Sequence, residues 1–285
     1  MEIVDRRESG ETVLRQCQLT EVYLLQVLDQ ICKKHGIRYF LVGGTLLGAM
    51  RHNGFIPWDD DIDVGMLKDD FNLAMKVLPK ELPEAILLQK PGSPYGIDAF
   101  AKLRDRKSFM GEPDATVANP SGIFLDIFQY ERMPNLPYKF LYLLIRARFG
   151  AFRRFRSALL RPRYSVVAKI FDCLVAGFWK CADWAARSFW HLLRLVAPAR
   201  GWQMIGESGF TNRIPDDAIF PLGEHLFEGG NFPIPCDWEW VLKSQYKDWR
   251  VMPPVEERHW HSRFIFPTQA PESWWALKKD DACAS

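Results

Sequence analysis

Two aspartates stand two positions apart, Asp61 and Asp63, at the end of an acidic run that begins at Asp59. Apolar residues recur at every second position from Ile62 to Met66, and this period of two predicts a strand. The two carboxylates then project from one side of the strand, roughly 6 to 7 Å apart along the chain. Magnesium prefers such hard oxygen ligands and fills its remaining positions with water and substrate phosphates. The pair therefore indicates phosphoryl-transfer chemistry at a divalent cation.

A third carboxylate, Asp126, lies inside the apolar run from Gly122 to Phe128. An ionised side chain in such a strand is costly unless it is paired or bound to a metal. We predict that Asp126 shares the metal or accepts the proton of an attacking hydroxyl. The alternative is a structural salt bridge to Lys102 or Arg104. Both basic residues could instead neutralise the phosphates of a donor, or simply be solvated on a strand surface.

A glycine pair precedes the acidic run. Gly43, Gly44 and Thr45 lie between a predicted strand (38–43) and a predicted helix (45–51). Glycines at such a junction let backbone N–H groups approach a phosphate at a helix N-terminus, where the helix dipole favours anions. Thr45 could cap the helix or donate to the phosphate. A role in binding the donor is therefore predicted for all three residues.

Two further polar clusters are weaker signals. Asp59 and Asp60 are compatible with a solvated acidic turn ahead of the strand. Near the end of the chain, His261 follows His259 by two positions. Because no cysteine or carboxylate cluster stands near the two histidines in the sequence, a structural or phosphate-contacting role is favoured over a zinc site.

The elements that would position these groups alternate between helix and strand. Apolar residues at helical spacing from Glu11 to His35, followed by Gly36, predict an amphipathic helix that ends at the glycine. A loop is predicted at 53–60. Further predicted elements are a helix at 70–78, strands at 85–89, 95–103 and 122–128, and a short helix at 238–246. The order indicates an α/β fold, in which helices flank a mixed sheet.

Composition changes twice along the 285 residues, which predicts three parts. Residues 1–135 would form the catalytic core, and residues 136–200 a basic helical insertion. Residues 201–285, rich in Pro, Gly and Trp, would complete the catalytic domain. With 48% apolar and 25% charged residues, the chain has the composition of a globular protein with a large core.

Charge is distributed unevenly, although the formal net charge is only +2. Residues 136–200 contain ten Arg and three Lys against two Asp, a net +11, which leaves −9 for the rest of the chain. Large apolar side chains alternate with the basic ones, so helices at 138–200 could lie on an anionic membrane surface. The uncharged stretches are too short for a spanning helix, so contact would be peripheral. The alternatives are a helical subdomain packed on the core, or a face that receives an acidic or lipid-linked glycan.

Cysteine usage and the N-terminus bear on location. The six cysteines form no C-x-x-C pair, which favours free thiols in a reducing compartment. The first twelve residues are polar and acidic, unlike a secretory signal peptide. A cytoplasmic protein is therefore expected, with peripheral contact at the inner face of the membrane as an extension of that expectation. No nucleic-acid partner is predicted.

The string from Phe40 to Val64, FLVGGTLLGAMRHNGFIPWDDDIDV, closely resembles the signature of the LicD family. This family includes bacterial phosphocholine transferases and is related to fukutin. The resemblance continues at 102–105, 122–128 and several points between 233 and 261. Two departures stand out: Lys247 replaces the glycine of a Tyr-Gly-Asp triplet, and Gln129 stands where proline is frequent.

The resemblance implies a nucleotidyltransferase-like core that holds one or two Mg²⁺ ions, or Mn²⁺, through Asp61, Asp63 and Asp126. The implied reaction moves a phospho-alcohol group, such as phosphocholine, from a CDP-linked donor to a sugar hydroxyl and releases CMP. The implied acceptor is a cell-surface glycan or its lipid-linked precursor, as in lipopolysaccharide or teichoic acid modification. The alternatives are a nucleotidyltransferase that attaches NMP itself to a small molecule or protein, and a nucleotide-binding protein without turnover.

Overall fold

The computed structural model describes residues 3–91, 100–111, 122–134, 199–205, 213–246, 248–258 and 260–270, with separate residues of a helical stretch between 170 and 192. The chain divides into two compact units, residues 1–131 with 204–285, and residues 132–203. The first unit contains every residue predicted for the catalytic site. Outside the described residues lie 136–169 and 193–198 of the predicted insertion, 95–99 of a predicted strand, Lys247 and His259.

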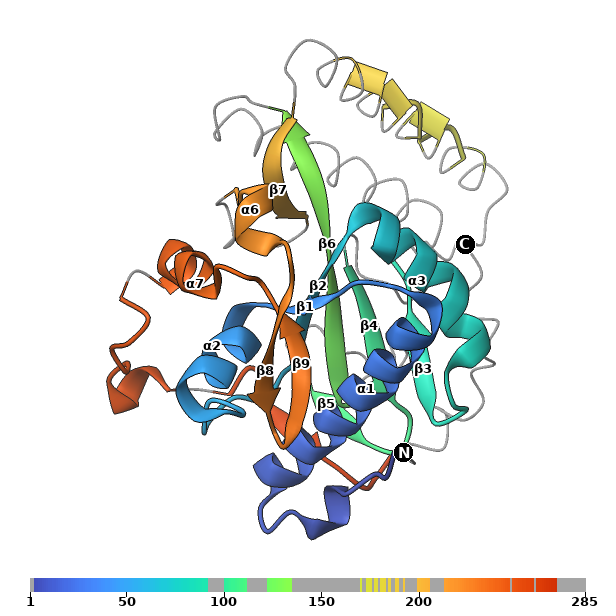
Figure 1. Ribbon diagram of the computed structural model, residues 1–285. Helices are drawn as coiled ribbons and strands as arrows, with labels where there is room; N and C mark the ends of the chain where they lie inside the picture. Colours follow the sequence, from blue (N-terminus) through green and yellow to red (C-terminus); the bar gives the residue numbers. More distant parts are fainter. Residues whose placement is uncertain are drawn as a thin grey trace. The chain divides into compact units, whose positions relative to one another are not determined.

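A mixed sheet forms the centre of the first unit, with strands in the order β1-β2-β6-β4-β3 (Figure 1). Their bounds are β1 Phe40–Leu41, β2 Asp63–Leu67, β6 Phe124–Pro134, β4 Phe100–Asp105 and β3 Ile86–Gln89. β2 and β6 run parallel, whereas the other neighbours on this path run antiparallel. β7 (Ala199–Ile205) pairs with β6 off the path. Helices accompany this sheet, so the predicted α/β class is confirmed.

Helix α1 (Val13–His35) is capped at both ends, and it ends at the glycine that the sequence predicts. Thr12 accepts a hydrogen bond from the Arg15 N–H at the N-terminus, and Gly36 ends the helix in the left-handed conformation with a φ of 64°. The helix buries the apolar stripe that includes Leu24, Leu25 and Leu28. α3 (Lys68–Glu81) packs near α1 and contacts β2. None of the described helices is both long and apolar enough to cross a membrane.

The C-terminal part of the first unit adds small elements around the sheet. α6 (Asp216–Ile219) precedes a hairpin of β8 (Gly223–Phe227) and β9 (Gly230–Ile234), which contacts β1 and α2 (Gly43–His52). α7 (Trp238–Tyr246) forms where a short helix is predicted and packs on α2. β10 (Phe264–Phe266) pairs with β5 (Phe109–Gly111). Short 3-10 helices occupy Arg7–Ser9 and Val255–Glu257. The end of the chain therefore returns to the sheet.

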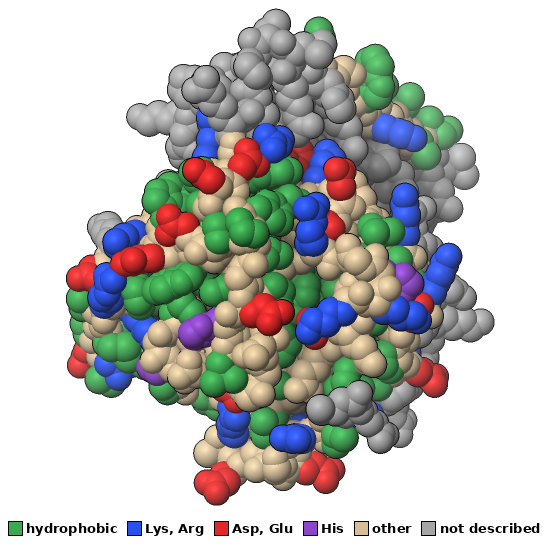
Figure 2. Space-filling view, in the orientation of Figure 1, with side chains coloured by type: hydrophobic (Ala, Val, Ile, Leu, Met, Phe, Trp, Pro, Cys, Tyr) green, Lys and Arg blue, Asp and Glu red, His purple; other side chains and the backbone are tan. Residues whose placement is uncertain are grey.

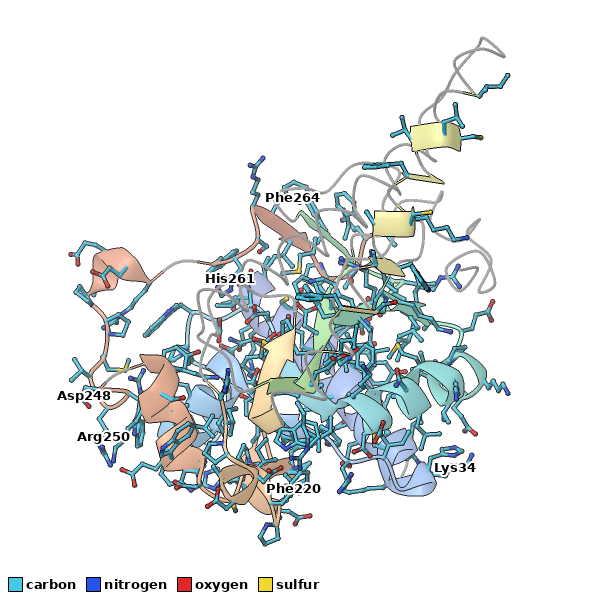
Figure 3. All side chains as sticks on the ribbon, turned by 90° about the horizontal axis from the view of Figure 1, so that it is seen from above. Lys34, Phe220, Asp248, Arg250, His261 and Phe264 are labelled. Atoms are coloured by element: carbon cyan, nitrogen blue, oxygen red, sulfur yellow. The ribbon has the colours of Figure 1, made fainter. Side chains whose placement is uncertain are left out.

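The described surface of the first unit mixes both signs of charge. Figure 2 shows Lys and Arg side chains interspersed with Asp and Glu over one face. Figure 3 places Asp248 and Arg250 on the segment after α7, and His261 and Phe264 on the last described segment. The acidic run ahead of β2 is different, because Asp60 in it is 0% exposed. This part of the acidic run therefore belongs to the interior and not to the charged surface.

Candidate active site

The parallel pairing of β2 with β6 brings two predicted site residues side by side. Asp63 and Asp126 are register partners on these strands, and Lys102 of β4 is the register partner of Asp126 on its other side. Residues in one such row project from the same face of a sheet. The row therefore places two carboxylates and one ammonium group next to each other.

The Lys102 ammonium neutralises Asp126 in the structure. Its Nζ lies 2.9 Å from Oδ1 and 3.1 Å from Oδ2 of Asp126, and both residues are buried. The ammonium also lies 3.3 Å from the centre of the Phe124 ring, a cation–π contact. The salt bridge weighed for Asp126 thus forms, and the alternative of a solvated Lys102 is wrong. The role of Asp126 at a metal stays a prediction.

Arg104 is engaged in the sheet. Its Nε donates to Gln89 Oε1 at 2.6 Å, and its Nη1 donates to the Gly122 carbonyl at 3.1 Å. The side chain is buried, so the alternative of a solvated residue is wrong here as well. These bonds join β3, β4 and the residues just before β6. The contact of Arg104 with a donor phosphate stays a prediction.

The acidic turn ahead of β2 is buried rather than solvated. Asp59 and Asp60 are 7% and 0% exposed, so the alternative of a solvated turn is wrong. Gln18 of α1 donates to the Asp59 carbonyl at 3.0 Å and holds the turn against the helix. Burial and the neighbouring Asp61 raise the pKa of Asp59 well above its ordinary value, and burial with Asp60 also raises the pKa of Asp61. Like charges held this close favour a cation among them.

Asp60 fastens the C-terminal segment to this turn. The backbone N–H groups of His261 and Ser262 donate to its two carboxylate oxygens at 2.7 and 3.0 Å, and the Ser262 hydroxyl donates to Oδ2. Burial works to raise the pKa of Asp60, but these hydrogen bonds outweigh it and hold the pKa below its ordinary value. Asp60 is thus a satisfied, ionised carboxylate with a structural role.

His261 places a positive charge over the acidic turn. Its Nδ1 lies 3.3 Å from Asp60 Oδ1 and 3.4 Å from Asp61 Oδ2. The hydrogen bond to Asp60 is the main cause that raises the pKa of His261 to about 9, so the imidazole is charged at neutral pH. Ligand atoms of Asp59, Asp60 and His261 lie within 4.8 Å of one another. Because His261 and Ser262 already donate hydrogen bonds to both Asp60 oxygens, this trio forms an ion-paired cluster in the structure.

The helix after β1 begins at the glycines themselves. α2 starts at Gly43 with Val42 as its N-cap residue, two residues before the predicted start. Thr45 therefore does not cap the helix. Its hydroxyl instead accepts a hydrogen bond from the Asp63 N–H at 2.8 Å. The bond positions the start of β2 against the first turn of α2.

The two glycines leave room for carboxylates. A Cβ atom at Gly43, whose φ is +57°, would stand 2.9 Å from Asp63 Oδ2, and a Cβ atom at Gly44 would stand 2.8 Å from Asp59 Oδ2. Any side chain would therefore displace an acidic group from the N-terminus of α2. The helix dipole stabilises negative charge at that position. The binding of a phosphate by the glycines stays a prediction.

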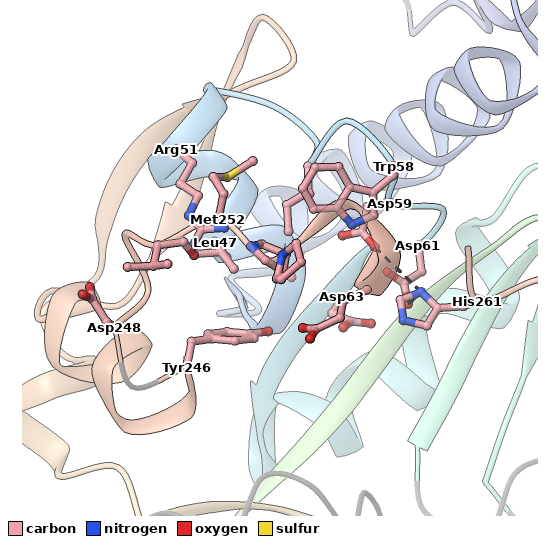
Figure 4. A pocket seen from close by; sticks show the side chains of 16 residues that line it. Leu47, Arg51, Trp58, Asp59, Asp61, Asp63, Tyr246, Asp248, Met252 and His261 are labelled. Atoms are coloured by element: carbon pink, nitrogen blue, oxygen red, sulfur yellow. Dashed lines mark hydrogen bonds and ion pairs between the residues drawn. The ribbon is translucent and has the colours of Figure 1, made fainter. Parts of the chain in front are cut away.

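A cavity of about 600 Å³ opens beside the acidic turn (Figure 4). Asp61 and Asp63 line it, and His261 lies at the same end. Asp248 lies at the other end, and the Tyr246 hydroxyl points toward Asp63. The remaining lining residues are Gly44, Leu47, Arg51, Ile56, Trp58, Asp59, Val251, Met252, Pro253, Pro254 and Glu257. The volume suits a ligand of nucleotide size, with the pair Asp61 and Asp63 at one end and apolar groups along the walls.

One wall of the cavity is held by Arg51 of α2. Its guanidinium donates to the backbone carbonyls of Trp249 and Val251, the latter at 2.8 Å. Trp249 itself packs edge-on against Trp238 of α7. Arg51 therefore positions the segment after α7 as a side of the cavity.

The sequence patterns do not predict that certain residues lie near the site. Glu21 of α1 is 0% exposed and is influenced by the acidic turn. It interrupts the apolar stripe at Cys17, Leu24 and Leu28, and a charged residue at such a position is the signal that could have identified it. Tyr246 lies at the end of a predicted helix. Its place in the cavity depends on how α7 packs on α2.

The residues present fit a divalent cation. Asp61 and Asp63 offer carboxylate oxygens at the surface of one cavity. These are the hard ligands that Mg²⁺ and Mn²⁺ prefer. Burial and the neighbouring Asp60 raise the pKa of Asp61, although His261 acts to lower it. A cation there would relieve the repulsion among these groups.

A mixed sheet that presents an acidic pair beside a glycine-initiated helix is an arrangement suited to phosphoryl transfer. Residues 36–135, which hold α2, the acidic turn and most of the sheet, match the family model described as LicD/FKTN/FKRP, nucleotidyltransferase domain. This match and the likeness to a LicD protein confirm the resemblance of the signature string to the LicD family.

Relatives extend this likeness over different lengths. The chain is 28% identical to the lipopolysaccharide cholinephosphotransferase LicD of Haemophilus influenzae over 270 residues, which cover 87% of this chain and 95% of that protein. It is 40% identical to the human ribitol 5-phosphate transferase FKRP over 68 residues, which cover 24% of this chain and 13% of that protein. It is 32% identical to the mouse ribitol-5-phosphate transferase FKTN over 117 residues, which cover 40% of this chain and 21% of that protein. The bacterial likeness therefore spans nearly the whole chain.

Proposed function

We propose that this protein transfers a phospho-alcohol group, such as phosphocholine, from a CDP-linked donor to a sugar hydroxyl and releases CMP. The acceptor in this proposal is a cell-surface glycan or its lipid-linked precursor. The observation that carries the proposal is the placement of Asp61 and Asp63 on one cavity beside the N-terminus of α2. The near-full-length likeness to a bacterial cholinephosphotransferase supports the choice of reaction.

The acidic pair would hold the metal. Asp61 and Asp63 offer oxygens to one or two Mg²⁺ ions, or to Mn²⁺, and Asp126 lies beside Asp63 in the sheet. The cation, when bound, supplies neutralisation of the donor diphosphate and of the departing CMP. His261 adds a fixed positive charge at the same end of the cavity. Lys102 in this proposal exchanges part of its contact with Asp126 for a donor phosphate.

The transfer itself is a displacement at phosphorus. The sugar hydroxyl attacks the phosphorus atom that carries the alcohol, and a new P–O bond forms. The bond from that phosphorus to the bridging oxygen breaks, and its electron pair leaves with CMP. The proton of the hydroxyl passes to a carboxylate, for which Asp126 is the candidate. The chain thus acts mainly by positioning and by electrostatics.

A second candidate is a nucleotidyltransferase that attaches NMP itself, because the matching family model is described as a nucleotidyltransferase domain. The same acidic pair would serve both reactions. The product separates them, since phospho-alcohol transfer releases CMP from a CDP-alcohol, whereas nucleotidyl transfer releases pyrophosphate from a nucleoside triphosphate.

A thermal-shift screen tests the donor. CDP-choline, CDP-ribitol, CDP-glycerol, CTP and UTP are each added with Mg²⁺ to the full chain, because a ligand that binds only the native state raises the melting temperature. We expect at least one CDP-alcohol to raise the melting temperature of the wild type more than CTP does. The same CDP-alcohol should not raise the melting temperature of Asp63→Ala. A matched shift in the variant contradicts the assignment of Asp63, and stabilisation by triphosphates alone favours the second candidate.

Contact with an anionic membrane surface is a further part of the proposal. The described residues between 170 and 192 are helical, and several large apolar side chains among them are 46–70% exposed. These side chains are Ile170, Leu174, Phe178, Trp184, Phe189 and Leu192. At 100° per residue all six fall on one side of a helix, within residues 136–200, whose net charge is +11.

Flotation with liposomes tests this contact. We expect the wild type to float with anionic vesicles and much less with neutral ones, because apolar insertion and charge attraction act together. Leu174→Glu with Trp184→Glu should abolish flotation. A charge substitution on the first unit, Leu73→Glu at an exposed position of α3, is the control and should float as the wild type does. Equal flotation of the double variant would remove the membrane from the proposal.

A further inference from the structure

Glu21 is a buried carboxyl group that the proposed reaction does not use. It lies in the middle of α1 and is 0% exposed. Its Oε1 accepts a weak hydrogen bond from Cys17 Sγ at 3.4 Å, whereas its Oε2 makes no hydrogen bond to any residue that the structure describes. A buried oxygen without a partner is unfavourable for the fold. Such an atom in a native protein calls for a bound water or ion.

The face of α1 that carries Glu21 lies against the acidic turn. Gln18, three positions earlier and on the same face, bonds the Asp59 carbonyl at 3.0 Å. After burial, Asp61 and Asp60 are the largest causes that raise the pKa of Glu21 well above its ordinary value. Glu21 therefore lies on the face of α1 that Gln18 fastens to the acidic turn, and its oxygen without a partner is buried there.

We propose that Glu21 belongs to the divalent-cation site, where its free oxygen accepts a hydrogen bond from a water ligand of the cation held by Asp61 and Asp63. This inference rests on the proposed function, because it takes the cation to be bound there. Mg²⁺ and its substitutes keep several waters when carboxylates bind them. An acceptor on those waters orients the inner ligands, so Glu21 is a positioning residue that approaches the cation from the helix side.

A purely structural role for Glu21 predicts something different. If Glu21 only fills space and bonds Cys17, a glutamine of the same shape should replace it without effect on metal binding. If Glu21 serves the cation, the loss of its charge should weaken binding even though the fold is kept. Glutamine also removes a carboxyl group from a like-charged cluster, so Glu21→Gln should melt at the wild-type temperature or above it when no metal is present.

The experiment is a titration of the full chain, stripped with EDTA and exchanged into buffer, with Mn²⁺ alone. Free Mn²⁺ is followed by electron paramagnetic resonance. We expect Glu21→Gln to bind Mn²⁺ at least about tenfold more weakly than the wild type, the range found for outer groups at metal sites. Glu131→Gln is the matched control, because it removes a buried carboxylate that pairs with Lys68 at 2.7 Å, and it should bind as the wild type does. Asp63→Asn should bind far less.

The outcomes separate the inference from the proposed function. Wild-type affinity in Glu21→Gln, with binding lost in Asp63→Asn, overturns the inference and leaves the proposed function in place. Wild-type affinity in Asp63→Asn overturns the assigned cation site and the inference with it. Should Glu21→Gln not fold, Glu21→Asp decides, because it keeps the charge but is one methylene shorter. Wild-type affinity in that variant also overturns the inference, and weaker binding supports it.

Discussion

The buried carboxylates of this protein lie in two contrasting electrostatic environments. Asp105, at the end of β4, is 0% exposed and accepts two hydrogen bonds from the Arg7 guanidinium, both at 2.7 Å. Asp59, Asp61 and Glu21 are also shielded from solvent, but the pKa of each is raised, first by burial and then by neighbouring carboxylates. One acidic group is neutralised within the fold. In the other group the pKa values of Asp59 and Asp61 stay raised, although the His261 imidazole lies beside both carboxylates.

The difference separates a structural carboxylate from one that is available for chemistry. A bidentate pair with arginine satisfies the lone pairs of a carboxylate and joins distant segments, here the N-terminus and β4. Carboxylates that repel each other destabilise the fold unless a cation joins them. Proteins keep such arrangements mainly at functional sites, where shifted pKa values are most frequent. Arg7 and Asp105 therefore serve stability, whereas we propose that the carboxylates of the acidic turn serve a cation.

The largest effect is expected on catalysis when a carboxylate of the acidic pair is removed. Asp63→Ala should lower the transfer rate by about 10³-fold or more, because the cation loses a ligand on the cavity. Release of CMP from the CDP-alcohol selected in the thermal-shift screen measures it, with a glycan acceptor present. Asp69→Ala, at an exposed position in the first turn of α3, is the control and should keep full activity. Comparable rates in Asp63→Ala and Asp69→Ala would contradict the assignment.

The next effect is on stability and concerns the neutralised carboxylate. Arg7→Met should lower the free energy of unfolding by about 3–5 kcal/mol, because Asp105 would be left buried without its partner. Urea unfolding followed by circular dichroism measures this change. Arg6→Met, at an exposed position next to it, should lie within about 0.5 kcal/mol of the wild type. A loss below about 1 kcal/mol in Arg7→Met would mean that Asp105 is not held as the comparison requires.

Much of the local structure follows from sequence patterns, and much of the tertiary pairing does not. The first helix ends at Gly36 as predicted, because an amphipathic stripe followed by a left-handed glycine is a local signal. Helix α7 likewise forms where a local sequence pattern predicts it. The start of α2 at Gly43 differs from the prediction, because glycine is a poor helix former, and the bond from the Asp63 N–H to Thr45 in that turn is a long-range contact. The pair of β5 with β10 joins short segments far apart in the chain, and neither segment alone specifies the other.

The site follows the same division. The D-x-D spacing identifies Asp61 and Asp63 because both lie within one short segment. The adjacency of Asp63 and Asp126 depends on the parallel register of two strands, which no local pattern sets. The bond from Ser262 to Asp60 joins groups about 200 positions apart in the chain. Long-range contacts of this kind become visible only in the folded protein.

Substitution in the acidic turn should act with the opposite sign to substitution of Arg7. Asp61→Asn should raise the stability of the metal-free protein by about 1 kcal/mol at neutral pH, because functional sites hold groups that the fold would not otherwise keep. The pKa of Asp61 is higher in the folded state than in the unfolded state, so the folded protein binds more protons at pH values between the two pKa values. Stability is therefore lost as pH rises through that window, and the variant should lose less. Melting curves in EDTA measure both effects. With Mg²⁺ present the wild type should gain more stability than the variant, and a lower melting temperature of Asp61→Asn in EDTA would contradict the comparison.

The smallest effect is expected at His261, the one cationic side chain that the C-terminal segment adds to the turn among the described residues. Its pKa is raised to about 9 chiefly by Asp60, with Asp61 and Asp59 contributing. A base with a raised folded-state pKa stabilises the fold fully below its unfolded pKa, near 6.5, and this contribution is lost as pH rises through about 9. The melting temperature in EDTA should therefore decrease as the pH rises from about 6.5 to about 9. In His261→Gln this decrease should be smaller. Since the side chain is 64% exposed, the change should stay within about 1 kcal/mol. His225→Gln, which alters a histidine beside Asn53, should keep the wild-type profile, and an equal fall in His261→Gln would show that the imidazolium does not offset the acidic turn.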